Sequence, residues 1–289
     1  MLAEKMLLAD TIPIAMSDYG VASLASYLGC SVRFGEDTIW YEPFITDTAL
    51  NDDLIIDREN KWYRIHFDIL KTLHAHRDEF FIGASCMSPG IDALYEMRGS
   101  DLLTDFYDRP DWVHMKQRQQ QASFFETFDE MYEYLKRDDG SMVVGYFSLF
   151  GKGKTMEMQC DISAMLSADL YREFELPYLE ERCERLDRTM YHLDGTQAQQ
   201  HLPALLSVKG LNAIEWTPQA SIERGGNPRW YGMYEQILAA GKSLQVVETT
   251  AEETVELFKT FGSKGLNCMT TNMTRRQAED MLDKLENYR

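Results

Sequence analysis

The chain has 289 residues, of which 29 are basic and 47 acidic, so its formal net charge is −18. A surface this negative repels phosphate backbones and anionic lipids, which argues against nucleic-acid and membrane partners. Hydrophobic residues make up 44% of the chain and charged residues 26%, which is typical of a folded globular protein and excludes a disordered one.

Targeting and redox signals indicate a cytoplasmic protein. No apolar run approaches the roughly 20 residues that cross a bilayer. The first ten residues, Met1 to Asp10, lack the basic, apolar and small-residue order of a signal peptide. The five cysteines are scattered and odd in number, so they do not indicate a disulfide framework.

Short apolar runs rich in β-branched and aromatic residues alternate along the chain with amphipathic stretches. This order predicts a parallel sheet, and up to eight strands favour a (β/α)₈ barrel formed by one domain over residues 1–289. The predicted strands are Thr11–Met16, Glu79–Ala84, Met142–Phe147, Thr155–Cys160, Thr189–Leu193, Asn212–Trp216, Ser243–Val247 and Gly265–Met269.

Helices are predicted between these strands, most clearly in the second half of the chain. The first of them begins after Ser167, a candidate N-cap. The others cover Gln197–Leu206, Trp230–Ala240, Glu252–Phe261 and Arg275–Tyr288. The segment Pro110–Arg137 predicts an additional long helix outside the regular alternation.

Active sites of such barrels lie at the carboxyl ends of the strands, so the residues found there are the candidates for chemistry. They form a polar ring that is able to bind metal. Its members are Cys86, Tyr146, Cys160, Asp161, His192, Asp194, Glu215, Trp216, Glu248 and Cys268.

The segment Tyr191-His192-Leu193-Asp194-Gly195 gives the most specific signal. Residues i and i+2 of a strand point to one face, so His192 and Asp194 converge, and Gly195 allows a sharp turn after them. An imidazole and a carboxylate so placed hold Zn²⁺ or act as an acid–base pair. The alternative is a histidine whose hydrogen bonds are satisfied by a neighbouring carboxylate.

The other candidates each have a structural alternative. Cys268 is a metal ligand or a small buried hydrophobe, and Cys160 beside Asp161 is a reactive thiol or a packed residue. Glu215, beside Trp216, is either a further metal ligand or part of a pocket wall. Glu248 binds substrate or precedes a helix, where negative charge is favoured.

Cys160 with Asp161 and His192 with Asp194 lie in stretches that, with others in matching order over most of the chain, resemble the uroporphyrinogen decarboxylase superfamily. The resemblance implies a (β/α)₈ barrel with its active site at the mouth. The similar stretches are Leu28-Gly29-Cys30, Asp37-Thr-Ile-Trp40, Glu42-Pro43, Arg98-Gly99, Asp108-Arg-Pro110, Gln159–Ser167, Phe174–Tyr178 and Tyr191–Gly195.

One branch of this superfamily comprises zinc methyltransferases that move a methyl group between a corrinoid protein and a thiol. Their H-x-C-G pattern matches His192 and Gly195, with Asp194 in place of the cysteine, and Cys268 matches a distal cysteine. The resemblance implies a zinc site of His192, Asp194, Cys268 and Glu215, with Cys160 as a supporting residue and a corrinoid protein as the partner. Zn²⁺ accepts oxygen ligands, so the aspartate leaves metal binding open.

The other branch comprises metal-free decarboxylases. Asp18 resembles their catalytic aspartate, and a lyase of this kind would use Asp194 or Asp161 to stabilise a cationic intermediate and His192 to move a proton. The chain lacks their arginine-rich N-terminal signature, since its first arginine is Arg33, so a tetrapyrrole polycarboxylate is not expected.

We therefore expect an enzyme acting on a small molecule, with methyl transfer ranked above carboxy-lyase chemistry. A barrel that only binds a ligand is the third alternative. Tyr146, Glu215, Trp216, Glu248 and Asp18 are the expected substrate-binding residues. A homodimer is compatible with the sequence, in which no exposed apolar stripe decides the oligomeric state.

Overall fold

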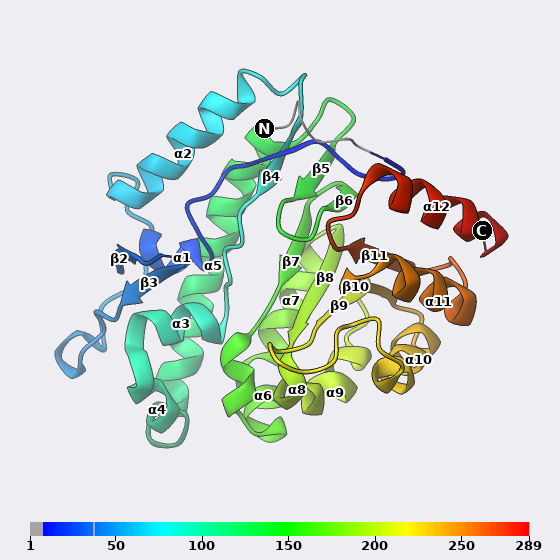
Figure 1. The fold of residues 1–289 in the computed structure, drawn as a ribbon. Helices are drawn as coiled ribbons and strands as arrows, with labels where there is room; N and C mark the ends of the chain where they lie inside the picture. Colours follow the sequence, from blue (N-terminus) through cyan, green and yellow to red (C-terminus); the bar gives the residue numbers. More distant parts are fainter. Residues whose placement is uncertain (1–7, 37, 289) are drawn as a thin grey trace. The chain divides into compact units, whose positions relative to one another are not determined.

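The structure, a computed structural model, describes residues 8–36 and 38–288. The chain divides into two compact units, here called the N-terminal unit (Ile14–Arg188) and the C-terminal unit (residues 8–13 and 189–288). Both units combine parallel strands with helices, which confirms the predicted α/β class (Figure 1). Within the described ranges, no helix has the length and apolarity needed to cross a membrane.

The N-terminal unit contains a four-stranded sheet in the order β1-β4-β5-β6. Strands β1, β4 and β5 are parallel, whereas β6 returns antiparallel to β5 and is followed by β7, which packs against both. The bounds are β1 (Ile14–Met16), β4 (Phe81–Ala84), β5 (Ser141–Val144), β6 (Leu149–Lys152) and β7 (Thr155–Met158).

Among its described residues, the N-terminal unit has seven α-helices. The longest, α5, begins at Pro110, where the missing N–H and fixed φ of proline suit a first helical position, and it confirms the predicted long helix. The bounds are α1 (Ser23–Tyr27), α2 (Lys61–His74), α3 (Ile91–Arg98), α4 (Leu102–Asp108), α5 (Pro110–Leu135), α6 (Ala168–Phe174) and α7 (Leu176–Arg185).

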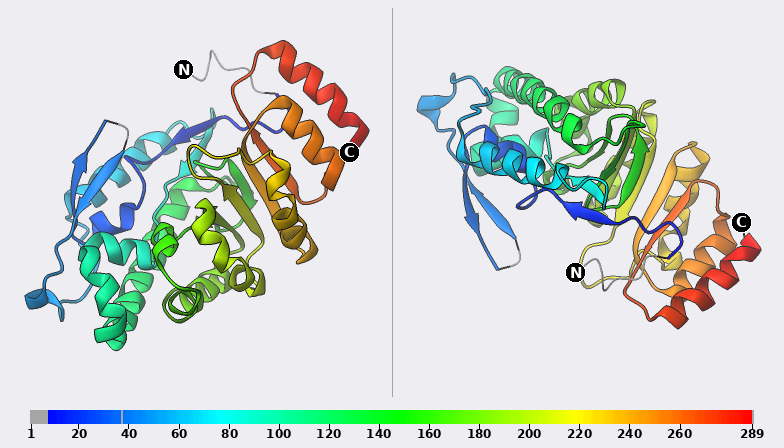
Figure 2. Two further views of the ribbon diagram at one scale, coloured as in Figure 1. Left: turned by 60° about the horizontal axis from the view of Figure 1, so that its bottom comes forward. Right: turned by 90° about the horizontal axis from the view of Figure 1, so that it is seen from above.

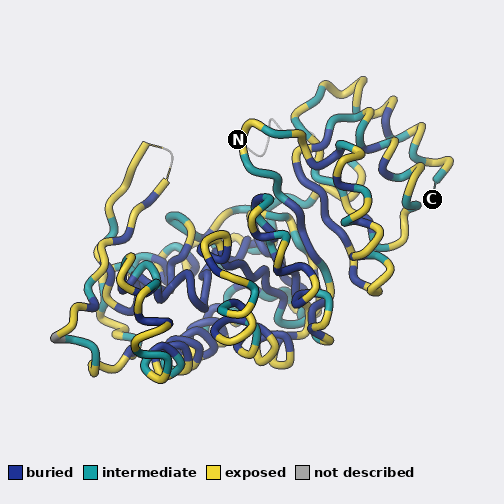
Figure 3. Tube along the Cα trace, turned by 90° about the horizontal axis from the view of Figure 1, so that it is seen from below, coloured by how far each residue is buried: buried dark blue, intermediate teal, exposed yellow. Residues whose placement is uncertain are grey.

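An antiparallel hairpin of β2 (Ser31–Phe34) and β3 (Ile39–Glu42) was not predicted from the sequence. It stands apart from the sheet of its unit as a two-stranded ribbon (Figure 2). Much of it is exposed (Figure 3), including Trp40, although Ile39 and Tyr41 are buried. Asp37, part of one stretch that resembles the decarboxylase superfamily, lies outside the described residues.

The C-terminal unit contains four parallel strands, β8 to β11, each hydrogen-bonded to the next in sequence order. Helices separate the strands, with α10 packed beside β10, α11 beside β11 and α12 against α11 (Figure 1). The bounds are β8 (Arg188–Asp194), α8 (Gly195–Ala198), α9 (Leu202–Ser207), β9 (Ala213–Thr217), α10 (Tyr231–Ala239), β10 (Ser243–Thr249), α11 (Ala251–Phe261), β11 (Leu266–Thr270) and α12 (Arg275–Leu285).

Local sequence signals explain these boundaries. The Ser167 hydroxyl accepts a hydrogen bond from the Leu170 N–H, as the N-cap prediction requires. Thr250 and Thr274 open α11 and α12 with reciprocal capping boxes. All eight predicted strands are present as β1, β4, β5 and β7 to β11, with ends that differ by a few residues. That the strands close into one barrel, and that the chain forms a single domain, remain predictions.

Candidate functional site

The carboxyl end of β8 carries the predicted histidine and aspartate. His192 and Asp194 lie two residues apart, and one ligand atom of each falls within 4.8 Å of the other. The chain turns directly after them, because Gly195 adopts a φ of 76° that favours glycine. The Thr196 N–H then donates to the Gln219 side-chain oxygen at 2.7 Å, which ties this turn to the loop that follows β9.

Glu215 on β9 fixes the orientation of the His192 ring. The two residues are paired in the parallel register, and His192 Nδ1 donates a hydrogen bond to Glu215 Oε2. The second carboxylate oxygen, Oε1, accepts a hydrogen bond from the Thr217 hydroxyl at 2.7 Å. A carboxylate on Nδ1 selects the tautomer in which Nε2 carries the lone pair for a metal or a proton.

The Glu215 side chain is fully buried at 0% exposure. Burial raises the pKa of this carboxyl, whereas the hydrogen bond from His192 opposes the rise, as does the one from Thr217. The charge of nearby Asp194 adds to the rise in pKa. The pKa of Glu215 is raised on balance, while its two hydrogen bonds favour the charged form.

Two further polar residues extend this pair across the sheet. Gln245 on β10 is in register with Glu215, and Asn267 on β11 is in register with Gln245. The Gln245 amide donates to Asn267 Oδ1 at 2.9 Å. In-register residues of parallel strands share a face, so His192, Glu215, Gln245 and Asn267 form one line, here called the polar row.

Sequence reasoning missed Gln245 and Asn267. Each is a polar residue inside an otherwise apolar strand, at Leu244-Gln245-Val246 and Leu266-Asn267-Cys268. A polar side chain at such a position costs free energy unless it is hydrogen-bonded. The presence of an amide in each strand could therefore have marked both residues as site candidates.

Cys268 and Trp216 lie on the opposite face of the same sheet. Cys268 is in register with Val246, and Val246 with Trp216. Trp216 is fully buried and contacts Trp230 at a ring distance of 5.0 Å, on the side of the helices. The structure therefore brings neither residue to His192, because successive residues of a strand alternate between faces.

The Cys268 thiol is also protonated where it lies and has few potential metal ligands around it among the described residues. Burial raises its pKa to about 12, so the protonated thiol prevails near neutral pH. In the described residues, Cys268 belongs to no group of three His, Cys, Asp or Glu ligand atoms within 4.8 Å of one another.

Glu248 is an exposed residue at the carboxyl end of β10. Its φ of 55° lies in the left-handed region, and the β10–β11 register shifts between Val246 and Thr249. Side chains with a Cβ rarely adopt this conformation, which costs about 1–3 kcal/mol where it is imposed. Glu248 is therefore exposed at an irregular strand end, and its role in substrate binding stays a prediction.

In the N-terminal unit, Asp18 and Tyr146 follow β1 and β5 and contact each other. Asp18 accepts hydrogen bonds from the Tyr146 hydroxyl and the Gly20 N–H, but burial dominates and raises its pKa to about 6. Asp18 Oδ2 is buried without a hydrogen-bond partner among the described residues. This carboxyl therefore exchanges a proton near neutral pH.

Within the N-terminal unit, a hydrogen-bonded network connects the ends of β4 and β7. Cys86 donates to the Gln159 side-chain oxygen at 3.2 Å, and the Gln159 amide donates to Asp161 Oδ2 at 2.8 Å. Asp161 is exposed, whereas Cys160 is buried and burial raises its thiol pKa well above the usual range. Burial of Cys160 therefore favours its protonated thiol, and its catalytic role stays a prediction.

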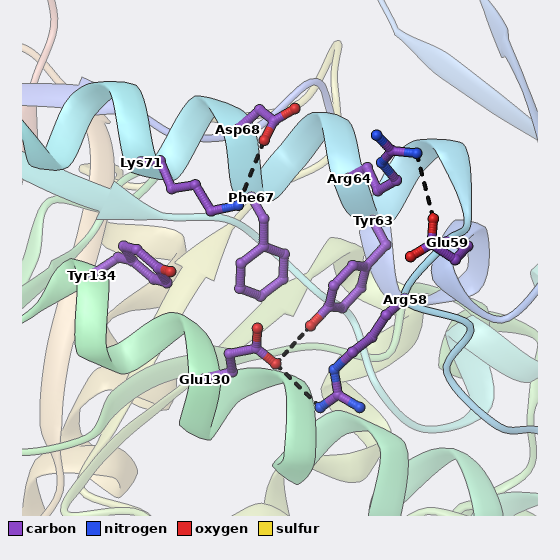
Figure 4. A pocket seen from close by; sticks show the side chains of 9 residues that line it. All are labelled: Arg58, Glu59, Tyr63, Arg64, Phe67, Asp68, Lys71, Glu130 and Tyr134. Carbon is purple, nitrogen blue, oxygen red and sulfur yellow. Dashed lines mark hydrogen bonds and ion pairs between the residues drawn. The ribbon is translucent and has the colours of Figure 1, made fainter.

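A hollow of about 340 Å³ opens between α2 and α5 (Figure 4). Its charged side chains pair with one another as Arg58 with Glu130 and Lys71 with Asp68. Tyr63 and Phe67 stack at 4.3 Å on its floor. The hollow contains none of the predicted site residues, and its charges are already neutralised.

Comparison with known proteins adds no identification. The sequence matches no protein-family model and no curated protein sequence.

Proposed function

We propose that this chain is a metal-dependent enzyme with its reaction centre at His192 and Asp194. The observation that carries the proposal is the buried Glu215 carboxylate on His192 Nδ1. Metal-binding histidines commonly donate their second ring N–H to a carboxylate, which orients the ring and increases its basicity. The Thr217 hydroxyl completes this arrangement by occupying the other Glu215 oxygen.

The donor set fits a divalent cation that accepts nitrogen and oxygen ligands. His192 would bind through Nε2 and Asp194 through a carboxylate oxygen, with Glu215 orienting the histidine. A thiolate-rich zinc site does not fit, since Cys268 lies on the other face of the sheet. The proposed ligand set is therefore narrower than the four residues His192, Asp194, Cys268 and Glu215 predicted from the sequence.

As in the zinc methyltransferases that the sequence resembles, the reaction we propose is methyl transfer to a thiol or another heteroatom. A bound cation would lower the pKa of that acceptor. Glu215 would hold the His192 ring in place, and Asp194 would balance the positive charge. A methylated corrinoid protein is the proposed donor. The parallel strands of both units support a (β/α)₈ barrel as the fold.

Metal content measured by mass spectrometry tests this proposal, on protein purified without a metal-chelating tag. We expect near-stoichiometric metal in the wild type and its loss in His192→Ala. His76→Ala, which removes an exposed histidine of the N-terminal unit, serves as the control and should retain the metal. Methyl transfer from methylcobalamin to a thiol should require the bound metal. No metal in the wild type, even after addition of zinc, cobalt and manganese salts, would overturn the proposal.

Asp18 favours a second candidate, a metal-free lyase. A carboxyl with a pKa of about 6 and a neighbouring tyrosine hydroxyl suits acid–base chemistry near neutral pH. This candidate predicts activity that EDTA leaves unchanged and that Asp18→Asn abolishes. Methyl transfer that survives Asp18→Asn and is lost with EDTA would exclude it.

A further inference from the structure

The polar row contains more polar groups than the His192–Glu215 pair needs. The hydrogen bonds of Glu215 are made with His192 and Thr217, so orientation of the ring does not require Gln245 or Asn267. Gln245 is nonetheless 5% exposed, in a strand whose neighbouring residues Leu244 and Val246 are apolar. An apolar residue there would avoid the cost of burying an amide.

Asn267 forms the accessible end of the row. Its Oδ1 accepts the bond from Gln245, and its side chain is exposed on the same face as His192. The bond from Gln245 holds the Asn267 amide in one orientation and leaves its NH₂ group as the outward hydrogen-bond donor. An exposed donor that is fixed by a buried amide is suited to binding an acceptor oxygen.

The charges on this face of the sheet determine which kind of acceptor oxygen can bind to Asn267. The face carries the carboxylates Asp194 and Glu215, and Glu248 lies exposed at the end of β10. Neither the row nor the described residues at the carboxyl ends of β8 to β11 include a lysine or an arginine. An anionic carboxylate would be repelled there, whereas a neutral carbonyl would not.

We infer that Gln245 and Asn267 form the anchoring end of the substrate site and bind a neutral carbonyl group of the substrate. Neighbouring strands lie about 4.8 Å apart, so the anchor is two to three spacings, about 10–14 Å, from His192 along the sheet. The substrate would then carry its carbonyl about that far from the atom that reacts. This inference rests on the proposed function, because it takes His192 as the reacting end.

Three probes of equal chain length test the inference: hexanamide, hexanoate and hexylammonium. Their binding to the full-length protein is measured by ligand-observed NMR titration at pH 7.5, before and after EDTA treatment. We expect hexanamide to bind more tightly than hexanoate in both preparations. Asn267→Ala should weaken hexanamide about fivefold, the range of one neutral hydrogen bond.

Asn267→Asp should reverse the preference towards hexylammonium, a change that a purely structural asparagine would not produce. Asn287→Ala is the matched control, since Asn287 is also an exposed amide with a single local hydrogen bond. Asn287→Ala should keep the wild-type unfolding temperature, because Asn287 is exposed. Asn267→Ala should lower it slightly, because the buried Gln245 amide loses its acceptor, whereas Asn267→Asp keeps an acceptor for that amide.

Equal binding of hexanamide by Asn267→Ala and the wild type would overturn the inference, as would hexanoate as the tightest probe. Failure of the proposed function has a different signature, namely the absence of bound metal in the wild type. The EDTA-treated protein separates the two results, because the amide preference does not depend on a metal.

Discussion

Two carboxyls of the candidate sites, the buried Glu215 of the C-terminal unit and the half-buried Asp18 of the N-terminal unit, differ in how their oxygens are bonded. Burial raises the pKa of both. Both Glu215 oxygens accept hydrogen bonds, one of them from an imidazole, whereas Asp18 Oδ2 has none among the described residues.

This difference separates two chemical roles. The hydrogen bonds on both Glu215 oxygens favour its charged form and fix its position, which suits a residue that orients a metal ligand. Burial raises the pKa of Asp18 to about 6, which suits a residue that gains and loses a proton near neutral pH. The two carboxyls thus differ in burial as well as in bonding, because Glu215 is fully buried and Asp18 only half-buried.

The largest expected effect comes from Glu215→Ala, which removes the partner of His192. The variant should lose about 2–4 kcal/mol of unfolding free energy, because the ring N–H is left unsatisfied and a cavity forms. Its metal affinity should fall about 10–100-fold. Urea denaturation and metal titration measure the two effects. Glu215→Gln keeps the volume and a carbonyl acceptor, so its loss of stability should be clearly smaller; equal losses would contradict the orienting role.

Asp18→Asn should stabilise the protein at alkaline pH. The pKa of Asp18 in the folded protein, about 6, exceeds its ordinary value of 3.8. The stability contributed by this group is therefore full below about pH 4 and is lost as the pH rises through about 6. Asparagine avoids that loss, so the variant should gain about 1–2 kcal/mol at pH 8, after allowance for partial solvent screening, and almost nothing at pH 4. Urea denaturation at both pH values measures the change, and a gain that is equal at both would show that the titration is not its cause.

The C-terminal unit shows how far sequence reasoning reached. Its strands and helices alternate regularly, so β8 to β11 were predicted, and the two-residue period placed His192 and Asp194 on one face. The pairing of Cys268 with Val246 could not be predicted from the sequence, because register depends on where each strand begins relative to its neighbour. One residue of register decides whether Cys268 faces His192 or the helices.

The N-terminal unit was less predictable because its chemistry lies in loops and hairpins. The β2–β3 hairpin and the antiparallel strand β6 interrupt the alternation that the prediction relied on. Asp18 and Tyr146 were both proposed as substrate-binding residues. Their contact arises from chain segments that follow two different strands, which residue spacing does not reveal.

Thr217→Val tests how much the second hydrogen bond contributes to the Glu215 arrangement. The variant removes the 2.7 Å bond to Oε1 and should cost about 1 kcal/mol of stability, with a smaller loss of metal affinity than Glu215→Ala. Thr270→Val is the control, since Thr270 is exposed at the end of β11 and should change stability by less than about 0.5 kcal/mol. Similar denaturation midpoints for the two variants would show that Glu215 does not depend on Thr217.

Tyr146→Phe tests the corresponding hydrogen bond to Asp18 and should have the smallest effect. The tyrosine hydroxyl stabilises the ionised carboxylate, so its removal should raise the Asp18 pKa further. Because the ionised form is then less favourable, stability at pH 8 should fall by about 0.5–1 kcal/mol, with little change at pH 4. The decisive measurement is the same substitution in the Asp18→Asn background, where the pH dependence should disappear. If it persists there, another group causes it, and Asp18 and Tyr146 do not act as a pair.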